Sequence, residues 1–500
     1  MAALINHKFD LDSRLNIGLN YRYDISERDK VDFSLGLVRG NTLFANFAVH
    51  SNLNFSGKPR TIMGRETLKE PYLEPYPRLN QEWKKYVTDS IIWQMANMGF
   101  VTHQIIFDDN ELIAEITQGR FLKPIFAIDL ASRVLANNAP KNIEIITVIN
   151  IERGIETFRA SIPRETIVKS ASKGPLDEKL LVFNQRENDE LGSMAIDNDF
   201  LYPHFSWSIR PHLNGTLQHQ IKFYFWQLEA LFAAEYAIKK GLYINTKIGI
   251  DIVSNLDKYT WHVPDGELHN VRQDRRLYLT EGESGIRQLS LEYLLDLHPN
   301  VKARLAAGYL EWMYGGFGGE TLYISDDRSW ALGLEAWWVK QREFDQKFSF
   351  QDYETVTGFL TYYQDLPFYD MRLKIRAGKF LGTDTGAHID ISRRFATGAR
   401  VGGIVALTNC DAVCTGEGSF NKWIYFQLPM NLFYQQSTTR EKIGYSWAPL
   451  TKNSGTVVET GSGLYNLMTH ANDEIDVNRL QPWSIKKIFS GFSRQPKERI

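Results

Sequence analysis

The chain lacks the long apolar runs that a membrane-spanning helix requires. No stretch of its 500 residues approaches the ~18 consecutive apolar residues of such a helix. It also lacks an excess of charge, because 57 Lys and Arg residues balance 59 Asp and Glu residues to a formal net charge of −2. Without such an excess, no overall field favours nucleic acid or anionic lipid as a partner. Any membrane location must therefore rest on alternating strands.

Cysteine is scarce, and the patterns of common catalytic sites are missing. Cys410 and Cys414 lie in a segment rich in Gly, Asp and Thr, which favours a small disulfide loop over a metal site that needs more ligands. The histidines lack metal-ligand spacing, and no nucleophile elbow marks a Ser/His/Asp triad. Gly315–Gly319 lacks the Lys-Ser/Thr of a phosphate-binding loop and favours a bend or a close backbone approach. We predict no metal, no cofactor and no catalytic residue, and expect that the chain is not an enzyme.

Alternation of apolar and polar residues dominates the start of the chain. In residues 14–23 every second residue is apolar, residues 31–37 repeat the pattern, and residues 42–54 follow it less cleanly. A period of two gives a strand one apolar face and one polar face. Aromatic residues make up 13% of the chain, which also favours β-structure.

Residues 75–195 have a different pattern. Prolines between residues 71 and 77 mark a linker, and apolar residues then recur at helical spacing. The pattern that follows predicts strands at 100–107 and 111–117, a helix at 123–138, and strands at 143–150 and 155–161. This α-β-β-α-β-β order resembles two copies of one unit and predicts a small inserted α/β domain. We expect its core to contain Trp83, Val87, Ile91, Leu130 and Val134.

From residue 200 to 430 the alternation returns and is sustained. A soluble β-sandwich also has this period, but its strands centre on about five or six residues. Here the segments approach the roughly ten residues of a tilted membrane-spanning strand, and tryptophans lie in or near them. Together with the long charged loop at 253–285, this pattern favours an antiparallel outer-membrane β-barrel. The alternating segments lie at 205–213, 242–251, 286–296, 301–312, 329–340, 356–364, 371–377, 387–393, 400–408 and 421–428.

The predicted fold is therefore mainly β, an antiparallel outer-membrane barrel with an inserted α/β domain in the periplasm. An outer-membrane protein must be exported, yet the first residues contain no signal peptide. Because residues 14–23 already have the pattern of a strand within a barrel, we expect a signal peptide and further sequence ahead of residue 1. The expected parts are N-terminal barrel strands (1–70), the inserted domain (75–195), the main barrel (200–435) and an irregular tail (436–500).

Several motifs occur in a fixed order between residues 200 and 455. They are Tyr202–Pro211, Gly315–Tyr323, Val339–Phe344, Gly378–Ala387 with Ser392-Arg393, and Trp447–Thr451. In this order they resemble the C-terminal portion of the YjbH/GfcD-type family of exopolysaccharide and capsule proteins. The resemblance implies an outer-membrane β-barrel that helps to secrete or assemble a surface polysaccharide, and it supplies no catalytic residues.

The clearest candidate site is a row of cations at Arg372, Lys374 and Arg376. In a barrel, Leu373 and Ile375 would face lipid and these cations would face the interior. One interpretation is a basic lumen that attracts an anionic polysaccharide. The other is that the cations pair with interior carboxylates, which is the commoner fate of desolvated charges. Further cations expected on the inward surface are Lys247, Lys302, Arg304 and Arg393, and the candidate carboxylates are Asp251, Glu292, Glu335 and Asp390.

The leading hypothesis is a non-enzymatic outer-membrane component of exopolysaccharide or capsule export. Expected partners are the surface polysaccharide, outer-membrane lipid and periplasmic export proteins that would bind residues 75–195, with no nucleic acid. One alternative is a structural barrel that anchors other secretion proteins without conducting anything. Another is a barrel enzyme at the membrane surface. An unblocked basic lumen would favour the first hypothesis and a filled lumen the second.

Overall fold

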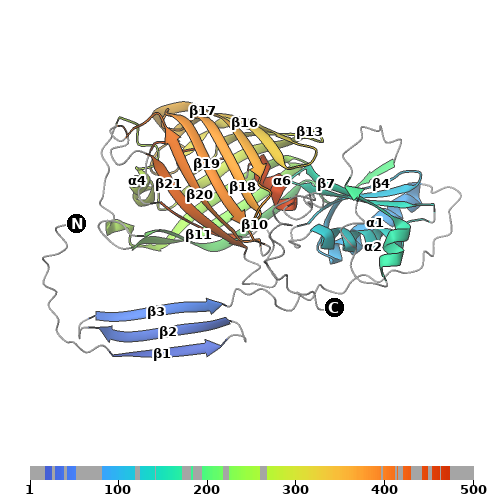
Figure 1. Cartoon of the computed structure of the whole chain (residues 1–500), viewed down its shortest axis with the longest axis horizontal. Coiled ribbons are helices and arrows are strands. Elements are labelled where there is room, and N and C mark those ends of the chain that lie inside the picture. The colour runs from blue at the N-terminus through green and yellow to red at the C-terminus, as the bar shows by residue number, and fades with distance from the viewer. Residues whose placement is uncertain are drawn as a thin grey trace. The chain divides into compact units, whose positions relative to one another are not determined.

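The protein is described by a computed structural model. The described residues are 17–24, 29–38, 42–51, 81–118, 124–140, 142–171, 182–183, 194–217, 224–258, 267–395, 398–411, 414, 420–429, 442–448, 453–461 and 463–472. Three sheets organise them, with three, six and thirteen strands (Figure 1).

The first sheet consists of β1 (Ile17–Asp24), β2 (Asp29–Val38) and β3 (Thr42–Ser51), paired antiparallel in chain order. The period of two sets the register, so that Leu19 lies opposite Leu35 on one face. On the other face Arg22 pairs with Asp32 at 2.6 Å.

The second sheet and its helices form what we call the α/β segment. Its strand order is β8-β7-β6-β5-β4-β9, with β5 and β6 parallel and the other neighbours antiparallel. Helices α1 and α2 cover one face of this sheet (Figure 1). The elements are α1 (Gln81–Asn97), β4 (Val101–Phe107), β5 (Glu111–Thr117), α2 (Pro124–Asn138), β6 (Ile145–Glu152), β7 (Ile155–Pro163), α3 (Arg164–Ala171), β8 (Val182–Phe183) and β9 (Met194–Asp197).

The core of the α/β segment follows from the spacing of its apolar residues. Val87, Ile91 and Met95 recur every fourth residue of α1, which places them on one helix face, and all three are buried. Leu130 and Val134 of α2 are buried in the same way, whereas Trp83 is only half-buried. The two helices and four of the strands lie at the positions that the sequence predicts, within a few residues.

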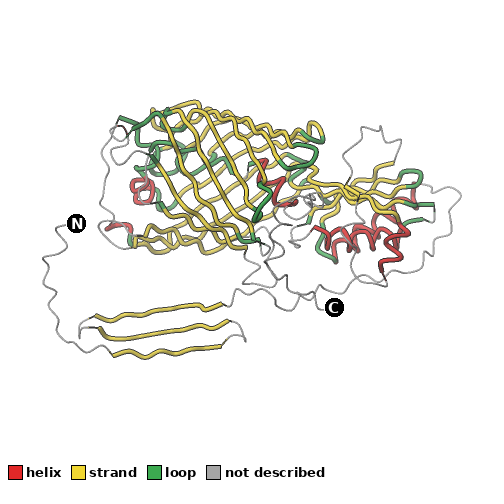
Figure 2. Tube along the Cα trace, in the orientation of Figure 1, coloured by secondary structure: helices red, strands yellow, loops and turns green. Residues whose placement is uncertain are grey.

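The third sheet joins thirteen strands in chain order, each antiparallel to its neighbours. It curves around an interior (Figure 2). Within the described residues, no pairing joins its first strand, β10, to its last, β22. The strands are β10 (His204–Leu217), β11 (Tyr224–Lys239), β12 (Leu242–Ser254), β13 (Gly285–His298), β14 (Val301–Tyr309), β15 (Tyr314–Ile324), β16 (Trp330–Arg342), β17 (Phe350–Asp365), β18 (Met371–Lys379), β19 (Thr385–Arg394), β20 (Arg400–Thr408), β21 (Asn421–Pro429) and β22 (Lys442–Trp447).

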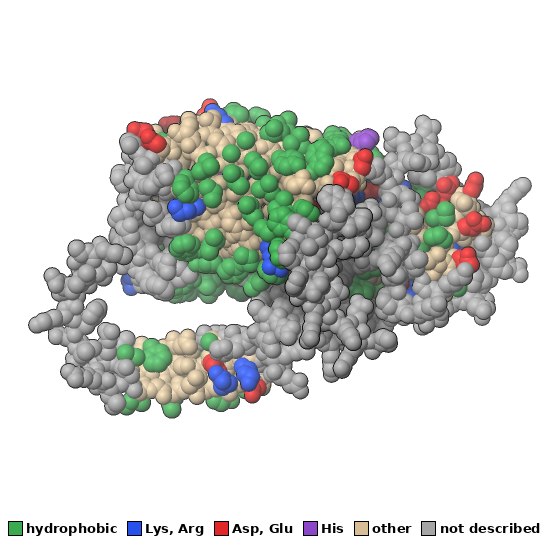
Figure 3. All heavy atoms as spheres, viewed as in Figure 1, with side chains coloured by type: hydrophobic (Ala, Val, Ile, Leu, Met, Phe, Trp, Pro, Cys, Tyr) green, Lys and Arg blue, Asp and Glu red, His purple; other side chains and the backbone are tan. Residues whose placement is uncertain are grey.

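The alternation gives this sheet an apolar outer face and a charged inner face. On β18, Leu373 lies opposite Ile391 of β19, and Ile375 lies opposite Tyr362 of β17. Ile391 and Tyr362 are exposed on the outer face. Many apolar side chains gather over this face in the space-filling view (Figure 3). The large ones include Ile250, Leu291, Leu305, Phe317, Leu334, Val356, Leu360, Val401, Leu407 and Ile424.

Loop 267–284 folds against the inner face near the ends of β14 and β16. Its helix α4 (Arg275–Glu281) carries Tyr278, which is fully buried and donates a hydrogen bond to the carbonyl oxygen of Arg342. Tyr278 packs in one apolar cluster with Leu310 and Trp337. A short 3₁₀ helix, η3 (Leu256–Lys258), contributes Leu256 to a second cluster with Leu279. These contacts fill the interior at this end.

The sequence predicts an irregular tail at 436–500, and this prediction is wrong for the residues that the structure describes there. Strand β22 extends the large sheet, and α6 (Leu464–Asn472) is a helix that contacts β14 and β15. Two further strands of the large sheet, β11 and the glycine-rich β15, were not expected from the sequence, nor were the short strands β8 and β9 of the α/β segment. Leu464, Leu467 and Met468 lie on one face of α6 and are buried, which explains why the helix forms against the wall.

Candidate functional site

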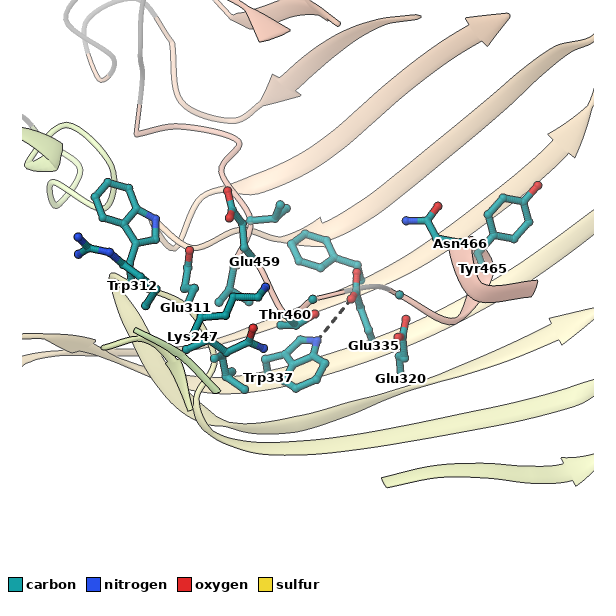
Figure 4. A pocket seen from close by; sticks show the side chains of 18 of the residues that line it. Lys247, Glu311, Trp312, Glu320, Glu335, Trp337, Glu459, Thr460, Tyr465 and Asn466 are labelled. Carbon is teal, nitrogen blue, oxygen red and sulfur yellow. Dashed lines mark hydrogen bonds between the residues drawn. The ribbon is translucent and has the colours of Figure 1, made fainter. Parts of the chain in front are cut away.

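The three cations of β18 point into the interior of the large sheet. Lys374 and Arg376 line an interior cavity of about 620 Å³, which is also lined by residues of β10–β13, β15–β17 and α4. Figure 4 shows part of this lining. Arg372 and Lys374 line a neighbouring cavity of about 570 Å³ against β19 to β22. The structure therefore brings this predicted row together on one face.

Most of the predicted interior cations are held by carboxylates. Arg372 Nε lies 2.7 Å from Asp365, and Arg376 Nη2 lies 3.1 Å from Glu335. Lys302 pairs with Asp296 at 2.5 Å. Two of the expected carboxylates, Glu292 and Glu335, act as partners. Such pairing satisfies the charges and leaves these cations less available to a ligand.

Arg304 lies between two carboxylates of the neighbouring strands. Its side chain is fully buried between Glu292 at 3.4 Å and Glu320 at 3.1 Å, and it lies over the ring of Trp337. It also donates a hydrogen bond of 2.6 Å to the carbonyl oxygen of Thr460. This arginine therefore joins two strands of the wall to a segment far along the chain.

Lys247, Lys374 and Arg210 differ from these paired cations. Within the part of the chain that the structure describes, none of them forms an ion pair. Lys247 and Arg210 both line the 620 Å³ cavity and a second one of about 560 Å³, and Lys374 lies 5.6 Å from the centre of the Tyr363 ring. These three cations remain open to an anionic ligand in the cavity. Arg210 was not predicted from the sequence.

Arg393 has another environment. Its guanidinium lies 5.4 Å from the Tyr369 ring centre and 4.8 Å from the Phe395 ring centre. It lines none of the interior cavities described above. The structure therefore does not bring Arg393 together with the other predicted cations.

A C-terminal segment, residues 453–461 and 463–472, lies inside the curved sheet. Arg272 donates to the carbonyl oxygen of Val457 at 2.7 Å, and the Leu381 backbone N–H donates to that of Thr456 at 2.9 Å. Helix α6 then begins against Glu320, whose carboxylate accepts a hydrogen bond of 2.9 Å from the Leu464 N–H. The interior is therefore partly filled by the chain itself, which sequence reasoning missed.

A buried ion pair lies beside this segment, because its arginine, Arg272, also bonds Val457. Arg272 donates two hydrogen bonds to Glu311, of 3.0 and 2.8 Å. Burial raises the pKa of the Glu311 carboxyl to about 7, while the charge of Arg272 lowers it and the charge of the nearby Glu459 carboxylate raises it. Glu311, Trp312 and Glu459 line the same cavity (Figure 4).

The α/β segment contacts the large sheet through the turn between β6 and β7. Arg153 at this turn pairs with Glu235 and, at 2.7 Å, with Glu292, and it lies over the Tyr243 ring. Gly154 adopts φ +87°, and a Cβ there would overlap the backbone of Gly241. This close approach requires glycine, because an L side chain has neither the space nor the backbone preference.

The remaining candidate features are the two cysteines, possible metal sites and possible membrane-spanning helices. Cys410 and Cys414 form a disulfide with Cα atoms 5.3 Å apart, and Cys410 is buried. Among the described residues, no group of three His, Cys, Asp or Glu side chains is arranged to hold a metal ion. No helix in the described ranges has the length and apolar character needed to cross a membrane.

Comparisons with known proteins identify relatives of the chain. A family model described as "Exopolysaccharide biosynthesis protein YbjH" matches residues 3–470. The chain is 26% identical over 467 residues to a protein of Escherichia coli (strain K12) named "Uncharacterized lipoprotein YjbH". The matched region covers 92% of this chain and 65% of that relative, so the chain spans about two thirds of the relative's length.

Proposed function

The chain belongs to the YjbH family of exopolysaccharide biosynthesis proteins, and from this premise we propose that it is a non-enzymatic outer-membrane component of exopolysaccharide secretion or assembly in a Gram-negative bacterium. In this proposal the thirteen-stranded sheet is the wall of a β-barrel. Its interior binds an acidic polysaccharide through the open cations Lys247, Lys374 and Arg210. The α/β segment lies in the periplasm and contacts other export proteins.

The observation that carries the proposal is the contrast between the two faces of the large sheet. The outer face exposes large apolar residues such as Leu334, which is 62% exposed, and Phe317, which is 57% exposed. An apolar surface of this extent needs a lipid or protein partner. The inner face carries cations and aromatic rings around a cavity, an arrangement suited to acidic sugars.

The comparisons support an envelope location. The Escherichia coli relative bears the name of a lipoprotein. A relative named as a lipoprotein supports a place for this chain in the cell envelope, and we place its barrel in the outer membrane. The family description supports the assignment to exopolysaccharide biosynthesis.

A second candidate function is a structural barrel that anchors secretion partners and conducts nothing. It is favoured by the pairing of Arg304, Arg372 and Arg376 with carboxylates and by the C-terminal segment inside the sheet. In that case the cavity would have no ligand, and Lys247 and Lys374 would have no role in polysaccharide output.

Neutralising the open cations distinguishes the two functions. The test variant combines Arg210→Gln, Lys247→Gln and Lys374→Gln, which leaves every described ion pair in place. The matched control combines Lys239→Gln, Lys258→Gln and Lys379→Gln, which removes the same charge from exposed positions and also leaves every described ion pair in place. Surface polysaccharide and the heat-dependent gel migration of the folded barrel are measured for both.

The proposal expects the test variant to assemble normally but to display about tenfold less polysaccharide, the effect of losing ~1.4 kcal/mol of binding free energy. The control should display the normal amount. Normal polysaccharide from a correctly assembled test variant would reject an acidic-polysaccharide site and favour the structural barrel.

A further inference from the structure

The C-terminal segment is bound to the wall in a way that permits its release. Gly455 accepts a hydrogen bond of 2.5 Å from His388 and donates one of 2.7 Å to Asp384. Thr460 accepts one from Arg304. None of these contacts belongs to the ladder of the large sheet. The segment could therefore leave the interior without breaking any strand pairing, and the exposed side chains of the wall would be free to bind water or a ligand.

Helix α6 closes one end of the space. Its Tyr465 stacks on Tyr363 with ring centres 3.6 Å apart, and Arg372 lies 4.9 Å from the Tyr465 ring centre. Its apolar face packs with Ile155 of the α/β segment and with Leu294 and Leu322 of the wall, in a single buried cluster that also contains Ala237, Tyr243, Ala331, Leu464, Leu467 and Met468. The helix is therefore held between the wall and the turn that carries Arg153.

The extended part of the segment runs through the cation-lined cavity. Glu459 is exposed and lines that cavity together with Lys247 and Arg210 (Figure 4). Lys247 and Arg272 both interact electrostatically with it. A carboxylate on an extended chain, which interacts with the charges of Lys247 and Arg272 in a cavity that Trp312 also lines, presents the same chemistry as one acidic sugar residue of a polysaccharide.

We propose that the C-terminal segment, residues 453–461 and 463–472, is an intramolecular plug that occupies the path of the acidic polysaccharide, with the Glu459 carboxylate in the place of a sugar carboxylate. The plug competes with the polysaccharide for Lys247, and the closed state is held by α6 and by the turn of the α/β segment. Occupation of the cavity by polysaccharide therefore requires the plug to leave. This inference rests on the proposed function for the identity of the ligand, but not for the existence of the plug.

A reversible covalent lock tests the plug. Tyr363→Cys and Tyr465→Cys replace the stacked rings in the full-length protein, in a background with Cys410→Ser and Cys414→Ser. Oxidation should fix α6 to the wall, and reductant should free it. The purified protein is assayed for binding of an oligogalacturonate, an acidic probe, and for ion conductance in a planar lipid bilayer. Tyr363→Cys alone in the same background is the control.

A released state is produced by Leu464→Asp. This change buries an unpaired carboxylate at the α6 interface and should expel the helix. Asn466→Asp adds the same charge at an exposed position of α6 that lines the cavity. This charge should repel the acidic probe without expelling the helix, so Asn466→Asp is the control for the charge alone. A plug that is displaced only a tenth of the time lowers the apparent affinity about tenfold. Leu464→Asp should therefore raise the oligogalacturonate affinity by about that factor and increase conductance.

Oxidation of the double-cysteine protein should abolish binding and lower conductance, and reductant should restore both. Glu459→Gln should raise the affinity, because the competing carboxylate is lost. Equal binding and conductance in the oxidised and reduced forms would overturn the plug. If conductance responds as expected but no variant binds the acidic probe, the plug stands, and both the carboxylate assignment and the proposed function fail.

Discussion

Arg304 shows how a single residue ties the interior together. Its guanidinium is fully buried, faces Glu292 and Glu320, and reaches the C-terminal segment at Thr460. A buried charge of this kind contributes little net stability when all its partners are present. Its removal is costly, because the carboxylates stay buried without a partner.

Arg304→Met should therefore lower the free energy of unfolding by ~3–5 kcal/mol. Adding Glu320→Gln should recover much of this loss, since it removes the uncompensated carboxylate. Lys340→Met is the control, because the Lys340–Glu354 pair is partly exposed and exposed pairs contribute about 0–1 kcal/mol. Urea unfolding in lipid vesicles measures all three. Equal effects of Arg304→Met and Lys340→Met would contradict the buried network.

His103 in β4, outside the large sheet, is expected to make the stability of the α/β segment depend on pH. It is buried and bonded through Nε2 to Thr117, whose hydroxyl donates to the carbonyl oxygen of Ile151, so Nε2 carries the proton. The other ring nitrogen lies 3.4 Å from the Tyr202 hydroxyl. Burial, and then the charge of Lys240, lowers the pKa of His103 to about 4.

The α/β segment should therefore lose stability as the pH falls from about 6.5, the pKa of an unfolded histidine, towards 4. Its contribution is present above pH 6.5, because both folded and unfolded states then carry a neutral ring. Hydrogen exchange of the β4 and β5 amides in the full chain should accelerate across this range. His103→Gln should remove this dependence while it retains a polar side chain. An unchanged pH profile in His103→Gln would show that another group titrates.

At the scale of elements, the sequence pattern predicted the features that neighbouring residues determine, such as the face of a strand on which a side chain lies. The inward direction of Arg372, Lys374 and Arg376 follows from a period of two, but their partners do not, because the pairing with Asp365 depends on the turn between β17 and β18. Strand β11 was missed because its alanines, leucines and glutamates weaken the alternation and favour helix.

Strand β15 was missed for a different reason. Glycine in the interior of a strand weakens it, so the sequence did not predict a strand here. The glycine is needed at position 318, because a Cβ there would overlap the Ala336 carbonyl and the Trp337 ring. The glycine leaves room for this buried tryptophan. The plug was missed because its partners, such as Glu320, His388 and Arg272, lie far from it in the sequence. Glycines at 455, 461 and 463 before the apolar face of α6 were the available signal.

The α/β segment is predicted to fold on its own. Residues 75–200, expressed alone, should be soluble and unfold cooperatively, because α1 and α2 cover one face of a complete six-stranded sheet. Ile91→Asp should unfold it, since Ile91 is fully buried and an unpaired carboxylate would take its place. Tyr86→Asp, at an exposed position of the same helix, is the control. Circular dichroism during urea titration measures both, and a disordered wild-type segment would contradict the prediction.

The turn between β6 and β7 is predicted to depend on Gly154. Gly154→Ala should detach this turn from the large sheet, because the Cβ overlaps Gly241 and the positive φ disfavours alanine. Gly461→Ala is the matched control for the backbone alone, since Gly461 has φ +84° and a Cβ added there would have no atom within 4 Å. Protease sensitivity of the chain near residue 153 measures detachment. Sensitivity near residue 153 that is no greater in Gly154→Ala than in Gly461→Ala would show that the turn stays attached and would contradict the prediction.

For the whole molecule, the apolar residues of the alternating strands define the surface that would face lipid in a membrane barrel. Leu334 lies away from the ends of β16, and its side chain points to the outer face beside Leu360 of β17. In a bilayer an arginine near the midplane on the lipid face costs ~2–4 kcal/mol, and the cost falls to about 0–1 kcal/mol near the interface. In water the same substitution at an exposed position costs little. The depth dependence of the cost therefore separates a membrane barrel from a soluble sheet.

Leu334→Arg should lower the free energy of unfolding in lipid vesicles by ~2–4 kcal/mol, because the guanidinium would lose its hydration. Trp330→Arg, at the first residue of the same strand, should cost about 0–1 kcal/mol for the charge itself, apart from the packing that Trp330 makes with Tyr323 and Tyr362. Trp330→Gln measures that packing separately, and Leu334→Gln gives the matching baseline. A difference between Arg and Gln that is large at 334 and small at 330 supports a lipid-facing wall. Equal, small differences at both positions would mean that the outer apolar face binds protein, and the barrel would then have to be abandoned.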